Sequence, residues 1–497
     1  MKILKSSRTR RLLCLVAVVL ALFMTLDALF PLPKTPGDAV QVVAADGKPL
    51  RIFPASDGLY RYPVSMKEVS PVYIEVLLAY EDRWFWWHPG INIFAIARAA
   101  GQNIWNLKVV SGGSTLTMQV ARLLDPHPRS FAGKIRQAFR ALQLEWYFEK
   151  KEILGLYLKL APFGGILSGV EAASRAFYDK QSIELSDAEA ALLVALPQAP
   201  SRLRPDRFPA RAKRARNKVL RRMTELNIWK KERVEAAFLE TVAVPKYSQP
   251  LKAPLLARRF RKKGGLIRTT ITSGLQGRLQ KLLGEHVKNL PSAHSAALLV
   301  VDNKTLSVRA YLGSGDFKDR SRFGHVDMIR AIRSPGSALK PFIYGMALDE
   351  GLIHSASLLA DIPRNHGDYR PANFTGGFSG PVNAEEALRR SLNLPAVQVL
   401  EHLGPSIFSS RLSRSGVFLK GPGGREPNLS LALGGAGITL EDLVRLFASL
   451  ARGGRVGQLR FKKNDELKER RLLSSGAAWI TWKMLRVDPY RMGRLNS

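Results

Sequence analysis

The sequence contains very little cysteine, since Cys14 is the only one in 497 residues. No disulfide can form within one chain, so hydrophobic cores have to hold the fold together. The lack of disulfides does not identify the compartment, because many exported proteins also do without them. A hydrophobic content of 46% and a charged content of 24% indicate a chain that forms such cores and is not disordered.

Acidic residues are also scarce. The chain has 41 Asp and Glu against 76 Lys and Arg, which gives a formal net charge of +35. Such a field favours an anionic partner, either nucleic acid or an acidic membrane surface. Nucleic acid is the weaker interpretation, because the basic stretches lack the interleaved aromatic residues of a base-stacking surface. We therefore expect no nucleic-acid partner and a chain that works at an anionic membrane surface.

Long hydrophobic runs are rare, and the main one lies near the N-terminus. Residues 12–30 are apolar except for Thr25 and Asp27. A helix of that length spans about 28 Å, which is roughly one hydrocarbon core of a bilayer. The basic tail, residues 1–11, predicts a cytoplasmic N-terminus and the bulk of the chain outside. A cleavable signal peptide is the alternative, but no small-x-small site follows the run, so we expect a retained single-pass signal anchor.

The segment after the anchor is punctuated by Pro and Gly. Residues 31–60 contain "AVQVVAADGKPLRIF", which predicts two short strands around an Asp46-Gly47 turn and thus a short β linker. Residues 61–200 show helical periodicity and are predicted to form a helical domain. Within it, "KIRQAFRALQLEWYFEKKEILGLYLKLA" is predicted to be one long amphipathic helix.

Two further segments complete the chain. Residues 201–265 are a basic connector with a helical pattern, containing 12 Lys and Arg but 2 Asp and Glu from Ser201 to Lys231. Its basic side chains form either a solvated face or a surface that lies against anionic lipid. Residues 266–497 mix both patterns: "SAALLVVDNKTLSVRAYLG" predicts a β-hairpin, and a helix is expected from Ser337 to about Leu348. This part is predicted to be a separate α/β domain.

The stretch "YEDRWFWWHPG" sets two carboxylates and an arginine against four aromatic rings. One interpretation is a surface ion pair beside a core stripe. The other is a carboxylate held near apolar surface for acid-base chemistry. The composition of the stretch leaves both interpretations open.

A second candidate site begins at "VSGGSTLTMQVARLL". Ser114 and Thr115 follow two glycines and precede a helix, so free backbone amides and two hydroxyls could hold a phosphate; a plain N-cap is the alternative. Cations gather after this turn, and arginine holds a diphosphate through several hydrogen bonds. The cations are Arg122, Arg129, Lys134, Arg136 and Arg140. The stretch is not a P-loop, because the Gly-Lys-Ser/Thr ending is missing.

A third site lies in "RSPGSALKPFIYG". Ser337 and Lys340 stand one helical turn apart and so share a face. A lysine in that position can activate the serine as an acyl nucleophile, the arrangement of penicillin-recognising enzymes.

Five stretches resemble, in order, the five motifs of the family 51 peptidoglycan glycosyltransferases: "EDRWFWWHPG", "GGSTLTMQ", "KIRQAFRALQLEWYFEKKEILGLYL", "GVEAASRAFYDK" and "LSDAEAALLVALPQAPS". The later stretches "RTTITSGLQGRLQ" and "SLNLPAV" resemble the transpeptidase domain of class A penicillin-binding proteins, and Ser391 and Asn393 match its second motif. Nearly the whole chain resembles that family, in particular its 1C type. The resemblance implies a multidomain chain with a mostly α, lysozyme-like domain and an α/β (α+β) serine transpeptidase-like domain.

The resemblance also implies a reaction. Glu81 would be the general base that takes the proton from the 4-hydroxyl of an acceptor sugar, whose oxygen attacks a lipid-diphosphate-linked donor with inversion. The implied substrate-binding residues are Ser114, Thr115, Gln119, Arg122, Arg129, Lys134, Arg136 and Gln137. The implied partners are lipid II, the growing glycan strand and other cell-wall synthesis proteins, at the bacterial inner membrane. Mg²⁺ or Mn²⁺ is implied as cofactor and no organic cofactor is, although the eight His residues form no metal motif.

The chain departs from the family pattern at three places. Gln137 stands where a second Glu is usual, and Lys159 stands where an Asn is usual. No Lys-Thr/Ser-Gly triplet follows Ser337. Gln137 and Lys159 lead us to expect reduced or specialised polymerisation, and the missing triplet leads us to expect a truncated, inactive transpeptidase domain. Gln137 and the truncation keep open the alternative of a non-catalytic cell-wall scaffold that only binds lipid II or partner proteins.

Overall fold

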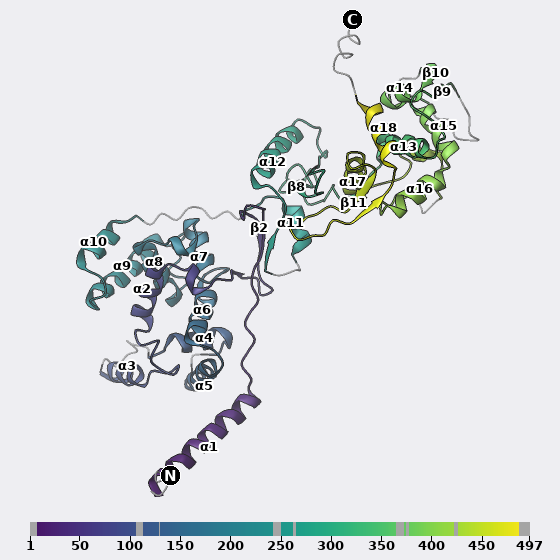
Figure 1. Ribbon diagram of the computed structural model, residues 1–497. Coiled ribbons are helices and arrows are strands. Elements are labelled where there is room, and N and C mark those ends of the chain that lie inside the picture. The colour runs from purple at the N-terminus through teal and green to yellow at the C-terminus, as the bar shows by residue number, and fades with distance from the viewer. Residues whose placement is uncertain are drawn as a thin grey trace. The chain divides into compact units, whose positions relative to one another are not determined.

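The computed structural model describes residues 7–105, 113–128, 130–241, 250–261, 265–363, 372–373, 377–421 and 426–486 (Figure 1). The chain divides into two compact units. Unit 1 consists of Met1–Val40 and Phe53–Gln249, and unit 2 of Gln41–Ile52 and Pro250–Ser497. This division crosses the predicted 31–60 linker and the predicted 201–265 connector, because parts of each pack into different units.

Unit 1 is mostly helical. Its helices are α1 (Ser7–Leu29), α2 (Pro71–Glu81), α3 (Ile93–Trp105), α4 (Leu116–Leu124), α5 (Phe131–Tyr147), α6 (Lys150–Leu160), α7 (Val170–Tyr178), α8 (Asp187–Ala195), α9 (Pro209–Glu225) and α10 (Lys231–Leu239). A small sheet has the order β3 (Tyr60–Arg61), β5 (Leu167–Ser168), β4 (Pro162–Gly164). Helix α8 is almost entirely buried and packs against α2 and α9, because its alanines let both helices approach closely.

Helix α1 is attached by its C-terminal end to α5. Arg140 of α5 donates to the carbonyl oxygen of Phe30 at 2.6 Å, and Gln143 donates to Asp27 at 2.6 Å and to the same Phe30 oxygen at 2.9 Å. These bonds satisfy a backbone carbonyl that the end of a helix leaves without a partner. Among the helices in the described part of the chain, none has the length and apolarity of a membrane span, so the anchor at residues 12–30 stays a prediction.

Of two predictions for the helices of unit 1, one is confirmed and one is wrong. Ser186 and Glu189 form the expected capping box at the start of α8. The single helix expected from "KIRQ" to "KLA" is wrong, because α5 and α6 are separate. Phe148 has extended backbone, and the Glu149 N–H donates to the Glu152 carboxylate at 2.8 Å, which starts a new helix there.

Unit 2 includes the predicted N-terminal hairpin. Strands β1 (Val40–Val43) and β2 (Pro49–Phe53) flank the turn at Gly47, whose φ of +80° suits glycine. Strand β1 also pairs in parallel with β6 (Leu266–Arg268), in the sheet order β2-β1-β6. The hairpin is therefore a structural part of unit 2 and not only a linker.

The rest of unit 2 is mixed α/β. The predicted second hairpin is confirmed as antiparallel β7 (Leu298–Val301) and β8 (Val308–Leu312), with α12 (Ser273–Lys288) packed against it. A helical core is centred on α13 (Lys340–Asp349), which packs against α15 (Asn393–Leu403) and α18 (Ser475–Leu485). The remaining elements are α11 (Pro254–Phe260), α14 (Ala384–Arg389), α16 (Pro405–Arg414), α17 (Leu440–Leu450), β9 (Leu358–Asp361), β10 (Gly380–Asn383), β11 (Arg455–Gly457) and β12 (Glu469–Arg471).

Candidate functional site

The carboxylate of Glu81, the last residue of α2, is held by two glutamine amides. Gln119 of α4 donates from Nε2 to Oε2 at 2.8 Å, and Gln198 donates from Nε2 to Oε1 at 2.9 Å. Gln198 ends the 3₁₀ turn Leu196–Gln198 that follows α8. Both carboxylate oxygens therefore accept a hydrogen bond from a neutral amide. Gln119 therefore contacts the candidate base, whereas the family resemblance placed it among the residues around the substrate.

The aromatic residues that follow Glu81 point in different directions. Phe85 is fully buried, and the Lys150 ammonium lies 4.7 Å from its ring centroid. Trp84, Trp86 and Trp87 are exposed, Trp87 to 82%. The stretch is thus partly core and partly exposed apolar surface beside the carboxylate, which combines the two interpretations that its composition left open.

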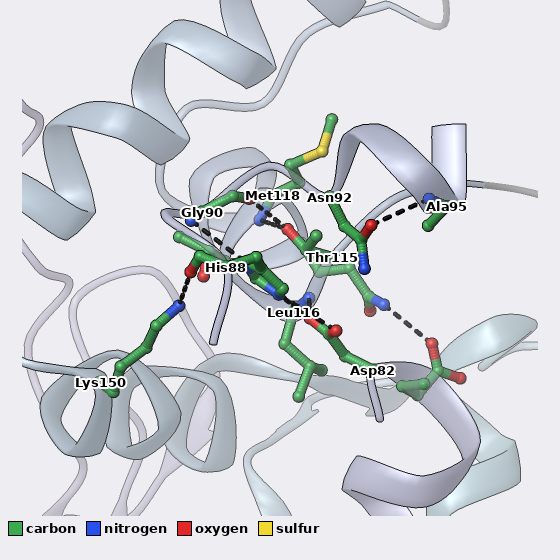
Figure 2. A network of polar contacts seen from close by, with 12 residues as sticks. Asp82, His88, Gly90, Asn92, Ala95, Thr115, Leu116, Met118 and Lys150 are labelled. Carbon is green, nitrogen blue, oxygen red and sulfur yellow. Dashed lines mark hydrogen bonds and ion pairs between the residues drawn. The ribbon is translucent and has the colours of Figure 1, made fainter. Parts of the chain in front are cut away.

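Asp82 ties the end of α2 to the start of α4 (Figure 2). Its buried carboxylate accepts from the Leu116 N–H at 2.8 Å and lies 3.0 Å from His88 Nε2. The Gly90 N–H donates to His88 Nδ1 at 3.1 Å, so Nδ1 is the acceptor and Nε2 carries the proton that is donated to Asp82. This network fixes the distance between Glu81 and the helix that carries Gln119.

In the turn before α4, some of the groups that could bind an anion already form hydrogen bonds within the protein. The Thr115 hydroxyl donates to the Gly90 carbonyl oxygen at 2.5 Å and accepts from the Met118 N–H at 3.1 Å, so it is a helix cap. The Leu116 amide already donates to Asp82. Of the two hydroxyls expected to hold a phosphate, Ser114 is the better placed, since its oxygen accepts from Lys134 Nζ at 2.6 Å and its proton has no acceptor among the residues that the structure describes.

Gln137 is buried between Lys134 and α4. Its Oε1 accepts from Lys134 Nζ at 3.1 Å, and its Nε2 donates to the Met118 carbonyl oxygen at 2.6 Å. A carboxylate could replace the first contact but not the second, because it has no N–H to donate. The other departure from the family pattern, Lys159, forms an ion pair with Asp38 at 2.7 Å.

The arginines expected around a diphosphate have different environments. Arg136 donates to both oxygens of Asp125, at 2.8 and 2.6 Å, and Arg140 donates to the same carboxylate at 2.9 Å. The Arg136 guanidinium, with that of Arg140, holds the pKa of Asp125 below its ordinary value. Arg136 is thus engaged by a carboxylate of the protein. Arg122 lies half-buried in the last turn of α4, and Arg129 lies outside the described residues.

Glu81 and the turn before α4 line one cavity of about 760 Å³, a size that suits a substrate. Several other residues that line this cavity were not predicted from the sequence. Three arginines line it, namely Arg83, Arg98 and Arg222, and so do the exposed apolar side chains Trp84, Trp87, Ile93 and Phe94. Arg222 stood within a basic run, but nothing in that run distinguished it from its neighbours.

The residues described do not form a ready metal site. Nowhere in the described ranges do three His, Cys, Asp or Glu side chains come together as a group that could hold a metal ion. The oxygens of Glu81 and Asp82 already accept hydrogen bonds from the protein. Mg²⁺ or Mn²⁺ therefore stays a prediction, and no step below uses it.

In unit 2, Lys340 is buried at the first position of α13. Its Nζ donates to the Ser391 carbonyl oxygen at 2.6 Å and to Asn393 Oδ1 at 2.7 Å, and lies 3.3 Å from the Ser391 hydroxyl. Burial lowers the pKa of Lys340 to about 8. Ser391 has a φ of +56°, a strained conformation for a residue other than glycine. The structure thus brings Lys340, Ser391 and Asn393 together.

Ser337 lies on the 3₁₀ turn Gly336–Leu339, just before Lys340, and its side chain is exposed. Its hydroxyl makes no hydrogen bond to the residues that the structure describes, while the Lys340 ammonium is directed to Ser391 and Asn393. The serine and the lysine are therefore neighbours, as the spacing predicted, without a hydrogen bond between their side chains.

Two family models match the chain. Residues 46–224 match the transglycosylase family, and residues 296–488 match the penicillin binding protein transpeptidase domain. The first match contains Glu81 and every residue that lines its cavity except Leu226, and the second contains Lys340, Ser391 and Asn393.

Among curated proteins, the chain is 55% identical to penicillin-binding protein 1C of Escherichia coli (strain K12) over 462 residues, which are 92% of this chain and 60% of that protein. It is 29% identical to penicillin-binding protein 1F of Bacillus subtilis (strain 168), over 79% of this chain and 57% of that protein. Penicillin-binding protein 1A of Haemophilus influenzae, a solved structure, aligns with a TM-score of 0.49 and 19% identity over 88% of this chain and 71% of that one. The chain thus spans about 60% of the length of the first two relatives.

Proposed function

Because the chain belongs to the class A penicillin-binding proteins, we propose that unit 1 polymerises lipid II into glycan strands. The observation that carries this proposal is the position of Glu81. A carboxylate held by two glutamine amides lines a substrate-sized cavity, and the turn with Ser114 lines the same cavity.

In the proposed reaction Glu81 is the general base. It takes the proton from the 4-hydroxyl of the acceptor sugar while that oxygen attacks the anomeric carbon of the donor, and the lipid diphosphate leaves with inversion. General-base assistance of this kind contributes about 10² to 10⁴ in rate. The amides of Gln119 and Gln198 orient the carboxylate, so it does not have to be ordered in the transition state.

The diphosphate of the donor needs cations and hydrogen-bond donors at the same cavity. Ser114 and Lys134 are in contact at 2.6 Å, and Arg83, Arg98 and Arg222 line the cavity. We assign the diphosphate to this cationic wall, with Arg122 and Arg129 as further candidates from the family motif. Thr115 caps α4, and Arg136 is engaged by Asp125, so both are supporting residues in this assignment.

The apolar surface supports a membrane setting. The described side chains of α1 include many exposed apolar ones, and Trp87, Ile93 and Phe94 are exposed where they line the cavity. We propose that residues 12–30 anchor the chain in the cytoplasmic membrane of a bacterium, with the N-terminus inside and both units outside. In that setting the net positive charge of the two units favours contact with anionic lipid, and other cell-wall synthesis proteins are within reach.

A polymerisation assay tests the function. The purified full chain in detergent is given fluorescent lipid II, and the products are separated by length. We expect polymer that is digested by a muramidase. Binding of lipid II without any polymer would contradict the proposal and support the non-catalytic scaffold.

The transpeptidase half suggests a second activity, acyl transfer at Ser337. Lys340, with its pKa lowered to about 8, is a suitable proton acceptor for a nucleophile. We propose that this chain by itself nevertheless does not take penicillin covalently, because it has no Lys-Thr/Ser-Gly triplet after Ser337 to align the β-lactam. Fluorescent penicillin should leave the chain unlabelled. Stoichiometric labelling that Ser337→Ala abolishes would refute this part of the proposal.

A further inference from the structure

Helix α9 carries a row of cations on one exposed face. At 100° per residue, five basic residues fall within an arc of about 100°. We call this row the α9 stripe: Arg211, Arg214, Lys218, Arg221 and Arg222. The opposite face of α9 is buried, so the stripe is the surface that this helix presents to solvent.

The stripe is poorly neutralised by the protein itself. Glu225, one turn beyond, pairs with Arg222 at 2.8 Å, and Arg211 stacks on the Phe208 ring at 4.9 Å. Within the described residues, Arg214, Lys218 and Arg221 have no ion-pair partner. Like charges three and four positions apart on a helix destabilise it. A solvated face usually mixes both signs of charge, so this arrangement indicates an external anion.

The stripe also leads to the active-site cavity. Arg222 and Leu226, at the C-terminal end of α9, line the cavity that contains Glu81. From Arg211 to Arg222 the helix rises about 16 Å. A chain that leaves the cavity along α9 would therefore pass a continuous row of positive charge.

We propose that the α9 stripe binds the growing glycan strand through the carboxylates of its peptides and keeps the strand on the enzyme between additions. This inference rests on the proposed glycosyltransferase function and deepens it. The strand is a hydrated polymer that repeats its anionic groups, which suits a row of charges. Anionic lipid is the less suitable ligand, because from Pro209 to Glu225 α9 exposes no large hydrophobic side chain of the kind that a membrane-surface helix inserts, and Arg211 lies over the ring of its N-cap, Phe208.

The test compares two triple variants of the full chain. The first, Arg214→Gln with Lys218→Gln and Arg221→Gln, removes the centre of the stripe and leaves Arg222 at the cavity unchanged. The control, Lys67→Gln with Lys151→Gln and Lys230→Gln, removes three exposed lysines elsewhere on unit 1, so both variants lose the same net charge.

The stripe variant should make several-fold shorter strands while it starts new strands at the wild-type rate, and the control variant should match wild type. Preformed soluble glycan strands that carry peptides should bind the stripe variant roughly 3- to 100-fold more weakly, the range for three exposed charge contacts. Added salt should reduce the binding of wild type but hardly that of the variant. Strands stripped of their peptides should not distinguish the two proteins.

Unchanged strand length and unchanged strand binding would overturn the inference. So would weaker binding of the stripe variant to phosphatidylcholine vesicles with phosphatidylglycerol, combined with unchanged strand binding, since the stripe would then be a lipid contact. If wild type makes no polymer, the proposed function fails, and the binding of preformed strands still decides the role of the stripe. Equal thermal stability of the two variants excludes a folding defect as the cause.

Discussion

Gln198 donates a hydrogen bond to Oε1 of Glu81 at 2.9 Å, although the two residues lie 117 positions apart in the sequence. Gln119 holds the other oxygen from α4. The candidate base is therefore positioned by two neutral amides from two different elements. Neutral donors orient a carboxylate without placing a cation beside it.

We predict that Gln198→Ala lowers kcat for polymerisation by about 10- to 100-fold, the range for losing a hydrogen bond to a charged group. The reason is that Glu81 loses one of its two orienting donors. The variant should keep its affinity for lipid II and its unfolding temperature, because Gln198 is exposed at the edge of the core. Steady-state kinetics measures kcat and the dependence of the rate on lipid II, and thermal denaturation measures the unfolding temperature.

Gln458→Ala, a change at an exposed glutamine of unit 2, is the matched control and should be silent. A Gln198→Ala enzyme with wild-type kcat would show that the bond to Glu81 has no catalytic role. A parallel fall in unfolding temperature would show that the residue is only structural.

Gln137→Glu should destabilise unit 1 by about 1–3 kcal/mol, the cost of leaving a buried polar group without its partner. The new carboxylate keeps the contact to Lys134 but faces the Met118 carbonyl oxygen, to which Gln137 now donates at 2.6 Å. Denaturant unfolding of the two proteins measures the difference. Gln137→Met, which removes the amide without adding a charge, should cost less. A Gln137→Glu protein as stable as wild type would contradict this account of the buried amide.

Arg122 and Arg136 should behave differently when changed to alanine. Arg122→Ala should lower kcat/KM for the lipid II donor by about 10- to 100-fold, if it contacts the diphosphate as the family motif implies. Arg136→Ala should mainly lower the unfolding temperature, because Asp125 loses one of the two guanidinium groups that it binds. A large kinetic effect of Arg136→Ala at unchanged stability would place Arg136 at the substrate instead.

The buried Lys340 should titrate near pH 8. Burial disfavours the charged ammonium, which lowers its pKa from 10.5 to about 8. Between these two values the unfolded chain holds the proton and the folded chain does not, so the stability of unit 2 should rise with pH across this range. NMR of the protein with ¹³C-labelled lysine should show an ε-carbon signal that titrates near 8 and is missing in Lys340→Arg. A signal that titrates at the ordinary lysine value would contradict the burial.

Local signals in the sequence predicted those parts of the sites that depend on one element. Ser337 and Lys340 are one turn apart, so a helical spacing rule was enough to place them together. Thr115 stands directly before α4, and the alternative of a plain N-cap is what the structure has for its hydroxyl. The turn at Asp46-Gly47 could likewise be predicted, because two adjacent residues determine its geometry.

Contacts between distant segments could not be predicted in this way. Gln198 lies at the end of a helix that the pattern did predict, but no local rule states which side chain its amide meets. Arg136 was expected to be free for a diphosphate, because nothing in the sequence revealed that Asp125 would accept from it. Strand β1 pairs with β6 across more than two hundred positions, and Gln41–Ile52, the middle of the predicted linker, belongs to unit 2. Such pairings depend on packing and not on periodicity.

The measurement that tests the central claim most directly is lipid II polymerisation by Glu81→Gln. The amide keeps the size of the side chain and cannot take a proton, so the rate should fall by about 10²-fold or more, while the fold and lipid II binding persist. Glu235→Gln, at an exposed carboxylate of α10, should leave the rate unchanged. Polymerisation by Glu81→Gln at close to the wild-type rate would contradict the assignment of Glu81 as the general base and with it the proposed mechanism.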